Sequence, residues 1–181
     1  MSHIATSAII DAAAVLFARH GFARTSVQAV ADAADYSKAG LLHHFPTKIA
    51  LHQAVLKECR AETERVRDRV TDLPVGPERD RRSIELLVDL SLARPGIASL
   101  LLSTVVPMGD DDISELDPLG DILFEAFDTE PTTDARRIRV IGALVALGVL
   151  AVEAHRCDSA SPWRNEIIAT SIDALGQPAP R

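Results

Sequence analysis

Residues 37–45 read Ser-Lys-Ala-Gly-Leu-Leu-His-His-Phe, and this short segment carries the strongest structural signal in the chain. Ser37 predicts a helix N-cap, because a serine side-chain oxygen can accept a hydrogen bond from an unpaired N–H of the first turn. Leu41 and Phe45 are four residues apart and would face inward, whereas Ala39 and His43 would lie on the opposite face. The predicted helix therefore has one face to anchor and one face to present.

The preceding segment predicts a second short helix that meets the first at a tight corner. Residues 25–28, Thr-Ser-Val-Gln, fit a capping box in which Thr25 and Gln28 satisfy each other's backbone N–H groups. Apolar residues then recur at helical spacing as far as Ala34, and two residues of turn follow before Ser37. This pattern predicts a helix-turn-helix, a motif whose second helix lies in the DNA major groove.

Residues 9–51 resemble the DNA-binding domain of the TetR family of repressors. The resemblance rests on three ordered segments that begin at residues 9, 25 and 37: Ile-Ile-Asp-Ala-Ala-Ala-Val-Leu-Phe-Ala-Arg-His-Gly-Phe, Thr-Ser-Val-Gln-Ala-Val-Ala and Ser-Lys-Ala-Gly-Leu-Leu-His-His-Phe-Pro-Thr-Lys. It implies an all-α chain of about nine helices. A three-helix DNA-binding domain is expected at residues 1–47, and a helical ligand-binding and dimerisation domain at residues 48–181.

Composition describes a folded chain whose acidity is unevenly distributed. Of the 181 residues, 47% are hydrophobic and 25% charged, which is enough to bury a core. The net charge of -7 disfavours a nucleic-acid partner at first sight. However, residues 1–48 carry four basic and three acidic residues, a sum of +1, so the remainder sums to -8. We expect weak non-specific DNA affinity, and specific binding that requires a dimer.

Several functional classes are disfavoured by the sequence. We find no secretory leader, and the apolar stretch 138–152, about fifteen residues, is too short to span a bilayer, so a cytoplasmic location is expected. Cys59 and Cys157 form no spacing motif and are expected to be reduced core thiols. The chain shows no catalytic signature, glycine-rich phosphate loop or metal-ligand spacing, so we predict no enzyme activity, no catalytic residue, no cofactor and no metal site.

Direct base readout is expected on the exposed face of the second helix. Lys38 to guanine is the best single candidate, with Ala39 and His43 beside it. Gly40 has no side chain and would suit a close approach of the backbone to DNA. Leu42 stands where the resembled family commonly has a tyrosine, and it could touch a thymine methyl group or shield the core edge.

Phosphate contacts are expected at the start of each helix. The resemblance implies such contacts from Thr25 and Lys48, while Arg24 could be a phosphate ligand or a solvated surface charge. Gln28 could cap its helix or reach a base edge. The full predicted DNA-binding set is Arg24, Thr25, Ser26, Gln28, Ser37, Lys38, Ala39, Gly40, Leu42, His43, His44 and Lys48.

The rest of the chain is predicted to be helical. The expected helices span residues 48–70, 81–93, 97–106, 119–127 and 133–156, and a last one begins at Ser161 as N-cap. The acidic segment 107–118 lacks the alternating ligands and central glycine of a calcium loop, so a solvated loop is expected.

The resemblance also places a dimer interface and a ligand cavity among these helices. The last two long helices would pair with those of a second chain through Gly142, Ala146, Val149, Trp163, Ile167, Ile168 and Ile172. A cavity for a small apolar inducer would be lined by Leu90, Leu101, Val105, Met108, Phe124, Phe127, Val149 and Glu153. Ordinary core packing is the alternative for each apolar member of this set, and for Glu153 the alternative is the wet edge of the dimer.

These features together predict a homodimeric regulator of transcription, most simply a repressor, that binds a palindromic DNA operator. Its two DNA-reading helices would lie about one helical turn, roughly 34 to 36 Å, or a multiple of it apart. A ligand would act by binding the mis-spaced state more tightly. The alternative is a DNA-binding regulator without a small-molecule ligand, controlled by a protein partner, and activation of transcription also stays open.

Overall fold

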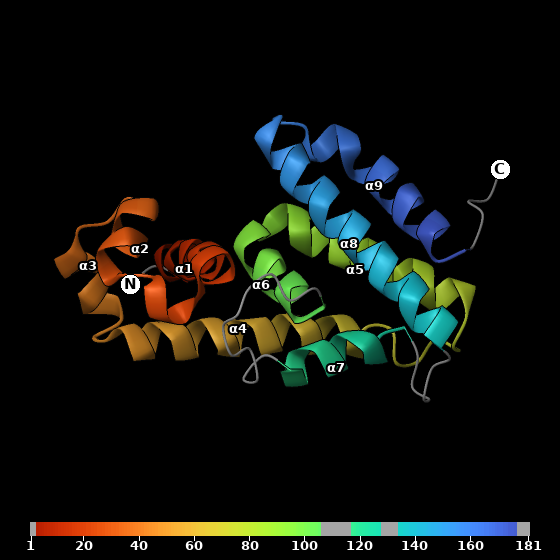
Figure 1. The fold of residues 1–181 in the computed structure, drawn as a ribbon, viewed down its shortest axis with the longest axis horizontal. Coiled ribbons are helices and arrows are strands. Elements are labelled where there is room, and N and C mark those ends of the chain that lie inside the picture. Colours follow the sequence, from red (N-terminus) through yellow and green to blue (C-terminus); the bar gives the residue numbers. More distant parts are fainter. Residues whose placement is uncertain (1–2, 106–116, 128–133, 177–181) are drawn as a thin grey trace.

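The computed structural model describes residues 3–105, 117–127 and 134–176, and in these residues it contains nine α-helices and no β-strand. The helices are α1 (His3–Arg24), α2 (Val27–Ala33), α3 (Lys38–His44), α4 (Lys48–Asp68), α5 (Pro77–Ala93), α6 (Pro95–Val105), α7 (Asp117–Glu125), α8 (Asp134–Arg156) and α9 (Ala160–Ala174). The predicted all-α fold is confirmed. Figure 1 shows α1, α2 and α3 at one end of the molecule and α8 beside α9 toward the other.

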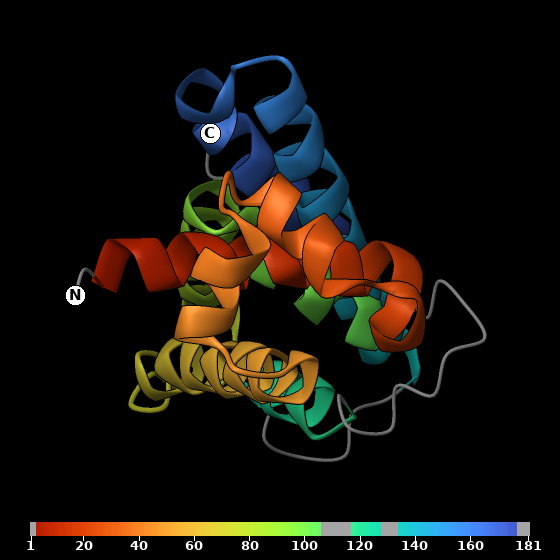
Figure 2. The ribbon, with the colours of Figure 1, turned by 90° about the vertical axis from the view of Figure 1, so that its left-hand side faces the viewer.

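The helices α1, α2 and α3, here called the head (residues 3–44), are built on the first helix. Gly21 interrupts α1 with a φ of 75° and a ψ of 164°, a conformation that glycine adopts readily, so the regular helix is broken at this residue. Ile9, Ala13 and Phe17 are buried on its inner face. They share one core with Leu41 and with the first half of α4. Figure 2 shows α2 and α3 in front of α1.

The head does not close its core alone, because α6 completes it. Ile97, Leu100 and Leu101 of α6 belong to the same buried cluster as the α1 residues. The carboxylate of Asp11 on α1 accepts hydrogen bonds from the backbone N–H groups of Gly96 (3.1 Å) and Ile97 (3.2 Å). An acidic group at these N–H groups complements the positive end of the α6 dipole, so α1 caps α6 from outside the helix.

Arg94 extends this contact to a third helix. Its guanidinium lies 3.5 Å from Asp11 of α1, and it donates to Glu58 of α4 at 3.0 Å, with Glu62 at 3.7 Å. We call Asp11, Glu58, Glu62, Arg94 and Gly96 the joint, because they connect the head, α4 and α6. Only 12% of the Glu62 side chain is exposed, because it turns toward Arg94.

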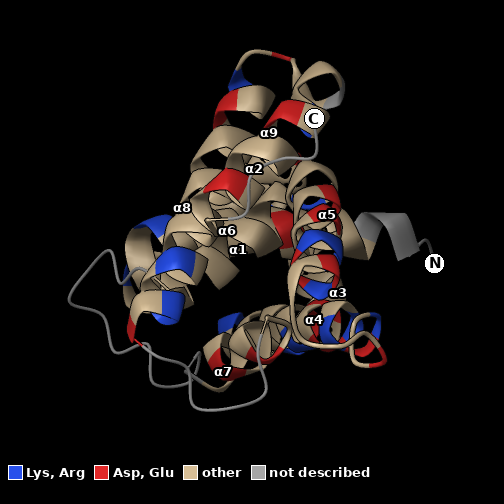
Figure 3. Ribbon diagram, turned by 90° about the vertical axis from the view of Figure 1, so that its right-hand side faces the viewer, with Lys and Arg blue, Asp and Glu red and all other residues tan. Residues whose placement is uncertain are grey.

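A second core fills the remaining helical domain. It is formed mainly by α5, α7, α8 and α9, with Val88, Phe127, Leu144 and Ile167 among its buried members. Arg79 crosses between elements and donates to the backbone carbonyls of Glu125 (2.7 Å) and Ala126 (3.0 Å) at the end of α7. Figure 3 shows acidic and basic segments along α5, and of these charged residues Arg79 and Asp80 are buried, at 4% and 1% exposed.

The starts of α5 to α9 differ from the sequence prediction, those of α7 and α8 by only one or two residues. Helix α5 begins at Pro77 rather than residue 81, because Gly76 turns the chain with a φ of 143° and proline fits a first helical turn. Likewise Pro95 opens α6 instead of only separating two helices. The N-cap of α9 is Ser159, not Ser161. The predicted acidic loop lies almost entirely outside the described residues.

Helix α8 is longer than its apolar stretch suggested. It has 23 residues, and by length and composition alone it could cross a membrane, which corrects the expectation that no segment is long enough. In the structure α8 packs against α5, α6 and α9, and about a third of its most apolar window is buried. A core helix of a folded domain meets the same length and composition criteria.

Candidate nucleic-acid interface

Helix α3 has the two faces that its sequence predicts. The Ser37 hydroxyl accepts from the backbone N–H of Gly40 at 3.0 Å and caps the helix. Leu41 is fully buried and Phe45 is 8% exposed, which anchors the inner face. Lys38 and His43 are exposed on the outer side, as is Ala39. The helix therefore presents a fixed row of side chains to a partner.

The turn between α2 and α3 is held by groups whose role the sequence did not reveal. Asp35 adopts a φ of 58°, which aspartate tolerates better than most residues. The Tyr36 N–H donates to the carbonyl of Ala31 at 2.8 Å, and the Tyr36 ring meets His44 edge-on at 5.9 Å. This ring contact fixes the end of α3 to the turn. It was not anticipated, because Tyr36 stands in the turn outside both helical repeats.

The predicted capping box is wrong by one residue. Ser26 is the N-cap of α2 and accepts from the Ala29 N–H at 3.0 Å. Thr25 is 4% exposed, and its hydroxyl donates toward the carbonyls of Gly21 (2.8 Å) and Leu16 (3.2 Å). Thr25 therefore ties the end of α1 to the start of α2, and burial disfavours the predicted phosphate contact.

Gln28 does not complete the capping box either. Its side-chain amide donates to the carboxylate of Asp32 at 2.7 Å, one turn further along α2. Gln28 is exposed, as is Ser26 at the helix start. The N-terminus of α2 therefore presents Ser26 and Gln28 to solvent, while the threonine side chain turns inward.

The two cations expected at phosphates are both placed by contacts inside the head. Arg24 is exposed, and its Nε donates to the carbonyl of His20 at 2.8 Å. Lys48 donates from Nζ to the carbonyl of Ala23 at 3.1 Å and lies 4.3 Å from the centre of the Phe22 ring. Lys48 thus has a structural role within the head, although a lysine at a helix start opposes the helix dipole.

The remaining residues of α3 that were predicted to bind DNA are less exposed than Lys38, Ala39 and His43. Leu42 and His44 are half-buried, which favours a packing contribution over a fully extended contact. A Cβ atom at Gly40 would lie 3.1 Å from the Ser37 hydroxyl oxygen, so the capping geometry itself gives a reason for glycine there. In the described residues no group of three metal-ligating side chains comes together, and His43 and His44 lie within no such group.

Comparison with known proteins bears directly on this head. Residues 9–55 match the family described as bacterial regulatory proteins, tetR family. Residues 9–55 form a TetR-family domain. The match covers α1 from Ile9, all of α2 and α3, and the start of α4. No curated protein sequence matches the chain.

Solved structures share the whole fold at low sequence identity. A Clostridium perfringens protein named for regulation of fatty acid metabolism is 18% identical, with a TM-score of 0.54 over 92% of this chain and 97% of the other. A TetR-like transcriptional regulator from Rhodococcus sp. RHA1 is also 18% identical, with a TM-score of 0.52 over 97% and 98%. AmtR of Mycobacterium smegmatis is 22% identical, with a TM-score of 0.51 over 95% and 86%. The TetR-type arrangement therefore extends beyond the head.

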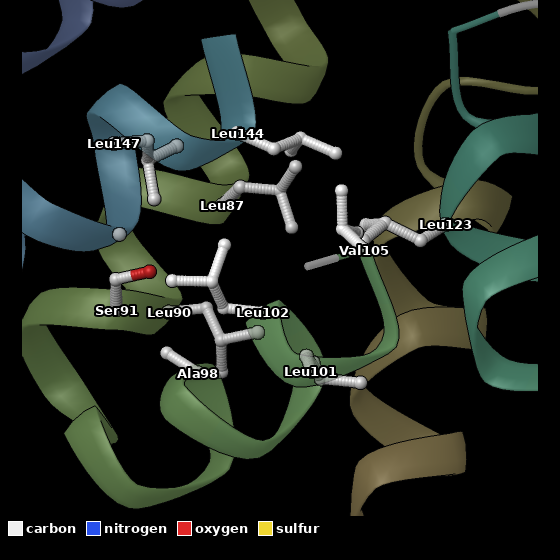
Figure 4. A pocket seen from close by; sticks show the side chains of 11 residues that line it. Leu87, Leu90, Ser91, Ala98, Leu101, Leu102, Val105, Leu123, Leu144 and Leu147 are labelled. Atoms are coloured by element: carbon white, nitrogen blue, oxygen red, sulfur yellow. The ribbon is translucent and has the colours of Figure 1, made fainter. Parts of the chain in front are cut away.

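The predicted ligand residues fall in different places in this TetR-type fold. Leu90, Leu101 and Val105 line a small cavity of about 30 Å³ between α5, α6, α7 and α8. Figure 4 shows the aliphatic side chains around this cavity, with Ser91 at one end and Leu123 and Val105 at the opposite end. The cavity is also lined by residues that were not predicted from the sequence: Leu87, Ala98, Leu102, Leu144, Leu147 and Gly148.

The other predicted ligand residues lie outside this cavity. Phe127 is 1% exposed in the core, and Phe124 packs under Arg137 with the guanidinium 4.6 Å from the ring centre. Val149 and Glu153 line a separate open groove between α1, α6 and α8. Met108 is outside the described residues. Sequence periodicity identified these residues as buried or amphipathic, but not the helix each would face.

Some of the predicted dimer residues are exposed, and the others are buried in their own chain. Gly142 and Val149 are exposed on α8, and Ala146 and Trp163 are partly exposed. Ile167, Ile168 and Ile172 are 1%, 7% and 2% exposed in the core of their own chain. These three isoleucines pack inside one chain and have little surface left for a second.

Proposed function

We propose that this TetR-type chain is a sequence-specific DNA-binding regulator of transcription, most simply a repressor, that binds a palindromic operator as a homodimer. The observation that carries the proposal is the fixed outer face of α3, which Leu41 anchors and Ser37 caps. A short rigid helix with an exposed lysine fits the width of the DNA major groove. We further propose a cytoplasmic location and no enzymatic activity.

Two kinds of DNA contact are proposed for the head. Lys38, with Ala39 and His43 beside it, would read base edges, because these residues form the exposed side of α3. Arg24 and Lys48 would contact phosphates, which fix register without reading sequence. Their intramolecular bonds to backbone carbonyls set the direction of each side chain before DNA arrives.

An exposed apolar face on α8 supports the homodimer. Ile138 is 67% exposed, Val149 55% and Val152 39%, and Gly142 lies on the same face by helical spacing. Such a row of apolar side chains is costly in water and suits an isologous contact with a second copy. Two copies paired in this way carry two heads, as a palindromic operator requires.

Small-molecule control is proposed as the regulatory input. Structural neighbours support it by their names: one is titled a fatty acid degradation regulator from Bacillus halodurans, with a TM-score of 0.51 at 14% identity. A ligand changes DNA affinity only if it binds one head spacing more tightly than another.

The small volume of the cavity between α5, α6, α7 and α8 favours a second candidate function. At about 30 Å³ it has room for about one or two water molecules, far below the roughly 300 Å³ or more of ordinary ligand sites. A regulator of this fold that responds to a protein partner, and not to a small molecule, would have such a packed domain. Calorimetric screening of the purified dimer against small molecules separates the two functions.

Binding of the protein to its own upstream DNA at two salt concentrations tests the DNA-binding proposal. Lys38→Ala should lose about 1 to 3 kcal/mol of discrimination between operator and mismatched DNA. Lys48→Ala should weaken binding to all sequences and reduce the salt dependence by about one ion. Lys57→Ala, at an exposed lysine on α4, is the matched control and should bind as wild type. If neither head variant differs from the Lys57 control, the head does not bind DNA as proposed.

A further inference from the structure

The end of α1 brings an aromatic ring against the first turns of α4. The helix is kinked at Gly21, whose φ is 75°, and Phe22 follows directly. From this position the Phe22 ring contacts both Lys48 and His52. These two residues are four positions apart and therefore lie on one face of α4. The kink thus places Phe22 over the face of α4 that carries Lys48.

The Phe22 ring is held in place by two further rings. The centres of the Phe22 and His52 rings are 4.5 Å apart, and their planes are tilted by 38°. Phe17 lies 5.9 Å from Phe22 and meets His52 edge-on at 5.2 Å. Phe17 is only 5% exposed and belongs to the core of the head, so it fixes the cluster to that core. Phe22 therefore presents its ring in a defined orientation.

The Lys48 ammonium group lies against this ring. Its Nζ atom is 4.3 Å from the ring centre, a distance at which the ring quadrupole attracts a cation. The same atom donates to the backbone carbonyl of Ala23 at 3.1 Å. An ammonium group has three N–H donors, so the carbonyl and the ring leave part of its donor capacity for an acceptor outside the chain. Lys48 is half-buried, and its charged end thus has a defined direction.

Packing against the ring does not require a charge at position 48. A lysine in the first turn of α4 opposes the helix dipole, whereas an apolar side chain could cover the same ring without that cost. Among the residues that the structure describes, Lys48 forms no ion pair with a carboxylate. The positive charge of Lys48 is therefore left to complement an anion that does not belong to the head.

We propose that Phe22 is a positioning residue for DNA binding, because its ring holds the Lys48 ammonium in the direction of a DNA phosphate while His52 supports the ring. A free lysine side chain loses rotamer freedom when it binds, and a preset direction removes part of this cost. This inference rests on the proposed DNA-binding function and adds the means by which one phosphate contact is preorganised. Phe22 acts through Lys48 and is not itself a proposed contact.

Fluorescence anisotropy with a labelled DNA duplex of mixed sequence tests the proposal at low salt, because a phosphate contact does not require the operator. Phe22→Leu keeps an apolar side chain but removes the aromatic face, and it should weaken binding about 2- to 10-fold. Phe22→Tyr keeps the ring and should recover most of that loss. Phe124→Leu is the matched control, because it removes a ring that lies 4.6 Å from the Arg137 guanidinium but is outside the head. This control should bind as wild type.

A double-mutant cycle separates positioning from a general effect on the fold of the head. If Phe22 acts through Lys48, Phe22→Leu should cause no further loss of DNA affinity in a Lys48→Ala background. Equal losses in both backgrounds would overturn the proposal. Tighter DNA binding by Phe22→Leu would also overturn it, because the ring would then hold Lys48 away from DNA.

Nuclear magnetic resonance of the unaltered chain gives a test that does not depend on whether the Phe22 variant folds. The ring should shift the εCH₂ protons of Lys48 upfield, and the signal is assigned by its absence from Lys48→Ala. The upfield shift should persist when the DNA duplex is added. A return of this signal to the ordinary lysine position on DNA binding would mean that Lys48 leaves the ring, and the proposal would fail.

The same titrations distinguish this inference from the proposed function. A wild-type protein that binds neither the mixed duplex nor its own upstream DNA at low salt contradicts DNA binding itself, and the positioning role with it. Binding that is weakened by Lys48→Ala, but not by Phe22→Leu, overturns only the positioning role and leaves the DNA-binding proposal intact.

Discussion

Two exposed helix faces of this molecule differ in kind, although both belong to helices with a buried opposite face. The outer face of α3 offers Lys38 and His43, small in area and polar. The outer face of α8 offers Ile138, Val149 and Val152, which are aliphatic. Water solvates the first at little cost and the second poorly. The contrast indicates a polar, intermittent partner for α3 and a lasting apolar partner for α8.

The outer face of α3 depends on the buried Leu41 side chain beneath it, and removing this side chain should give the largest effect. Leu41→Ala removes a fully buried side chain and should cost about 2 to 5 kcal/mol of unfolding free energy. Leu42→Ala makes the same chemical change on the same helix at a half-buried position and should cost less. Chemical denaturation followed by circular dichroism measures both values. Equal losses would mean that α3 is not anchored by Leu41.

An aspartate on the exposed face of α8 tests whether this face contacts a second copy of the chain. Val149→Asp should raise the dimer dissociation constant by more than about 100-fold, because an unpaired carboxylate would be buried against the second copy. Val75→Asp is the matched control, since Val75 is 52% exposed in the turn before α5, and Val149 is 55% exposed. Light scattering after size-exclusion chromatography reports the mass. A Val149→Asp protein that stays dimeric at low concentration would place the interface on another surface.

The joint connects the two regions and should show an intermediate effect. Asp11→Ala leaves the N–H groups of Gly96 and Ile97 without their acceptor, and we expect a loss of about 0.5 to 2 kcal/mol, typical of a removed helix cap. Asp32→Ala, at an exposed aspartate of α2, is the matched control. Thermal unfolding compares them, and an unchanged melting temperature for Asp11→Ala would show that the cap contributes little.

The two cysteines give the smallest effect and report on the core that the head shares with α6. Burial, the largest cause, raises the pKa of the Cys59 thiol to about 12, so almost no reactive thiolate exists at pH 8. Cys157 is exposed, which corrects the expectation that both thiols are in the core. Iodoacetamide followed by mass spectrometry should modify Cys157 alone in folded protein and both in denaturant. Rapid modification of Cys59 would mean that this core opens readily.

The sequence predicted most of the head because its signals are local. The cap at Ser37 and the buried position of Leu41 depend on neighbours within one helical turn. The same locality explains the errors. Thr25 and Ser26 are both good cap residues, and only the packing of α1 against α2 directs Thr25 inward.

Prediction was weaker where a residue's partner is distant in sequence. Helical periodicity marks Ile167 and Val149 alike as apolar positions, but not whether the covering surface belongs to the same chain or a second one. The ligand candidates failed for a related reason, since Leu90 and Phe124 differ only in how α5 and α7 pack. The contacts of the joint could not be predicted from the sequence, because Asp11 and Gly96 are 85 residues apart.

The close approach of α1 to α6 limits how this protein can be recombined. A Cβ atom at Gly96 would overlap the backbone carbonyl oxygen of Asp11, so only glycine fits there without a shift of one helix. A hybrid made by cutting at residue 47 and grafting a foreign regulatory domain would place Asp11 against a different α6. A graft of this head therefore needs an acceptor domain that carries glycine at the position of Gly96. Otherwise the first helix of the head must be redesigned to fit the α6 of the acceptor.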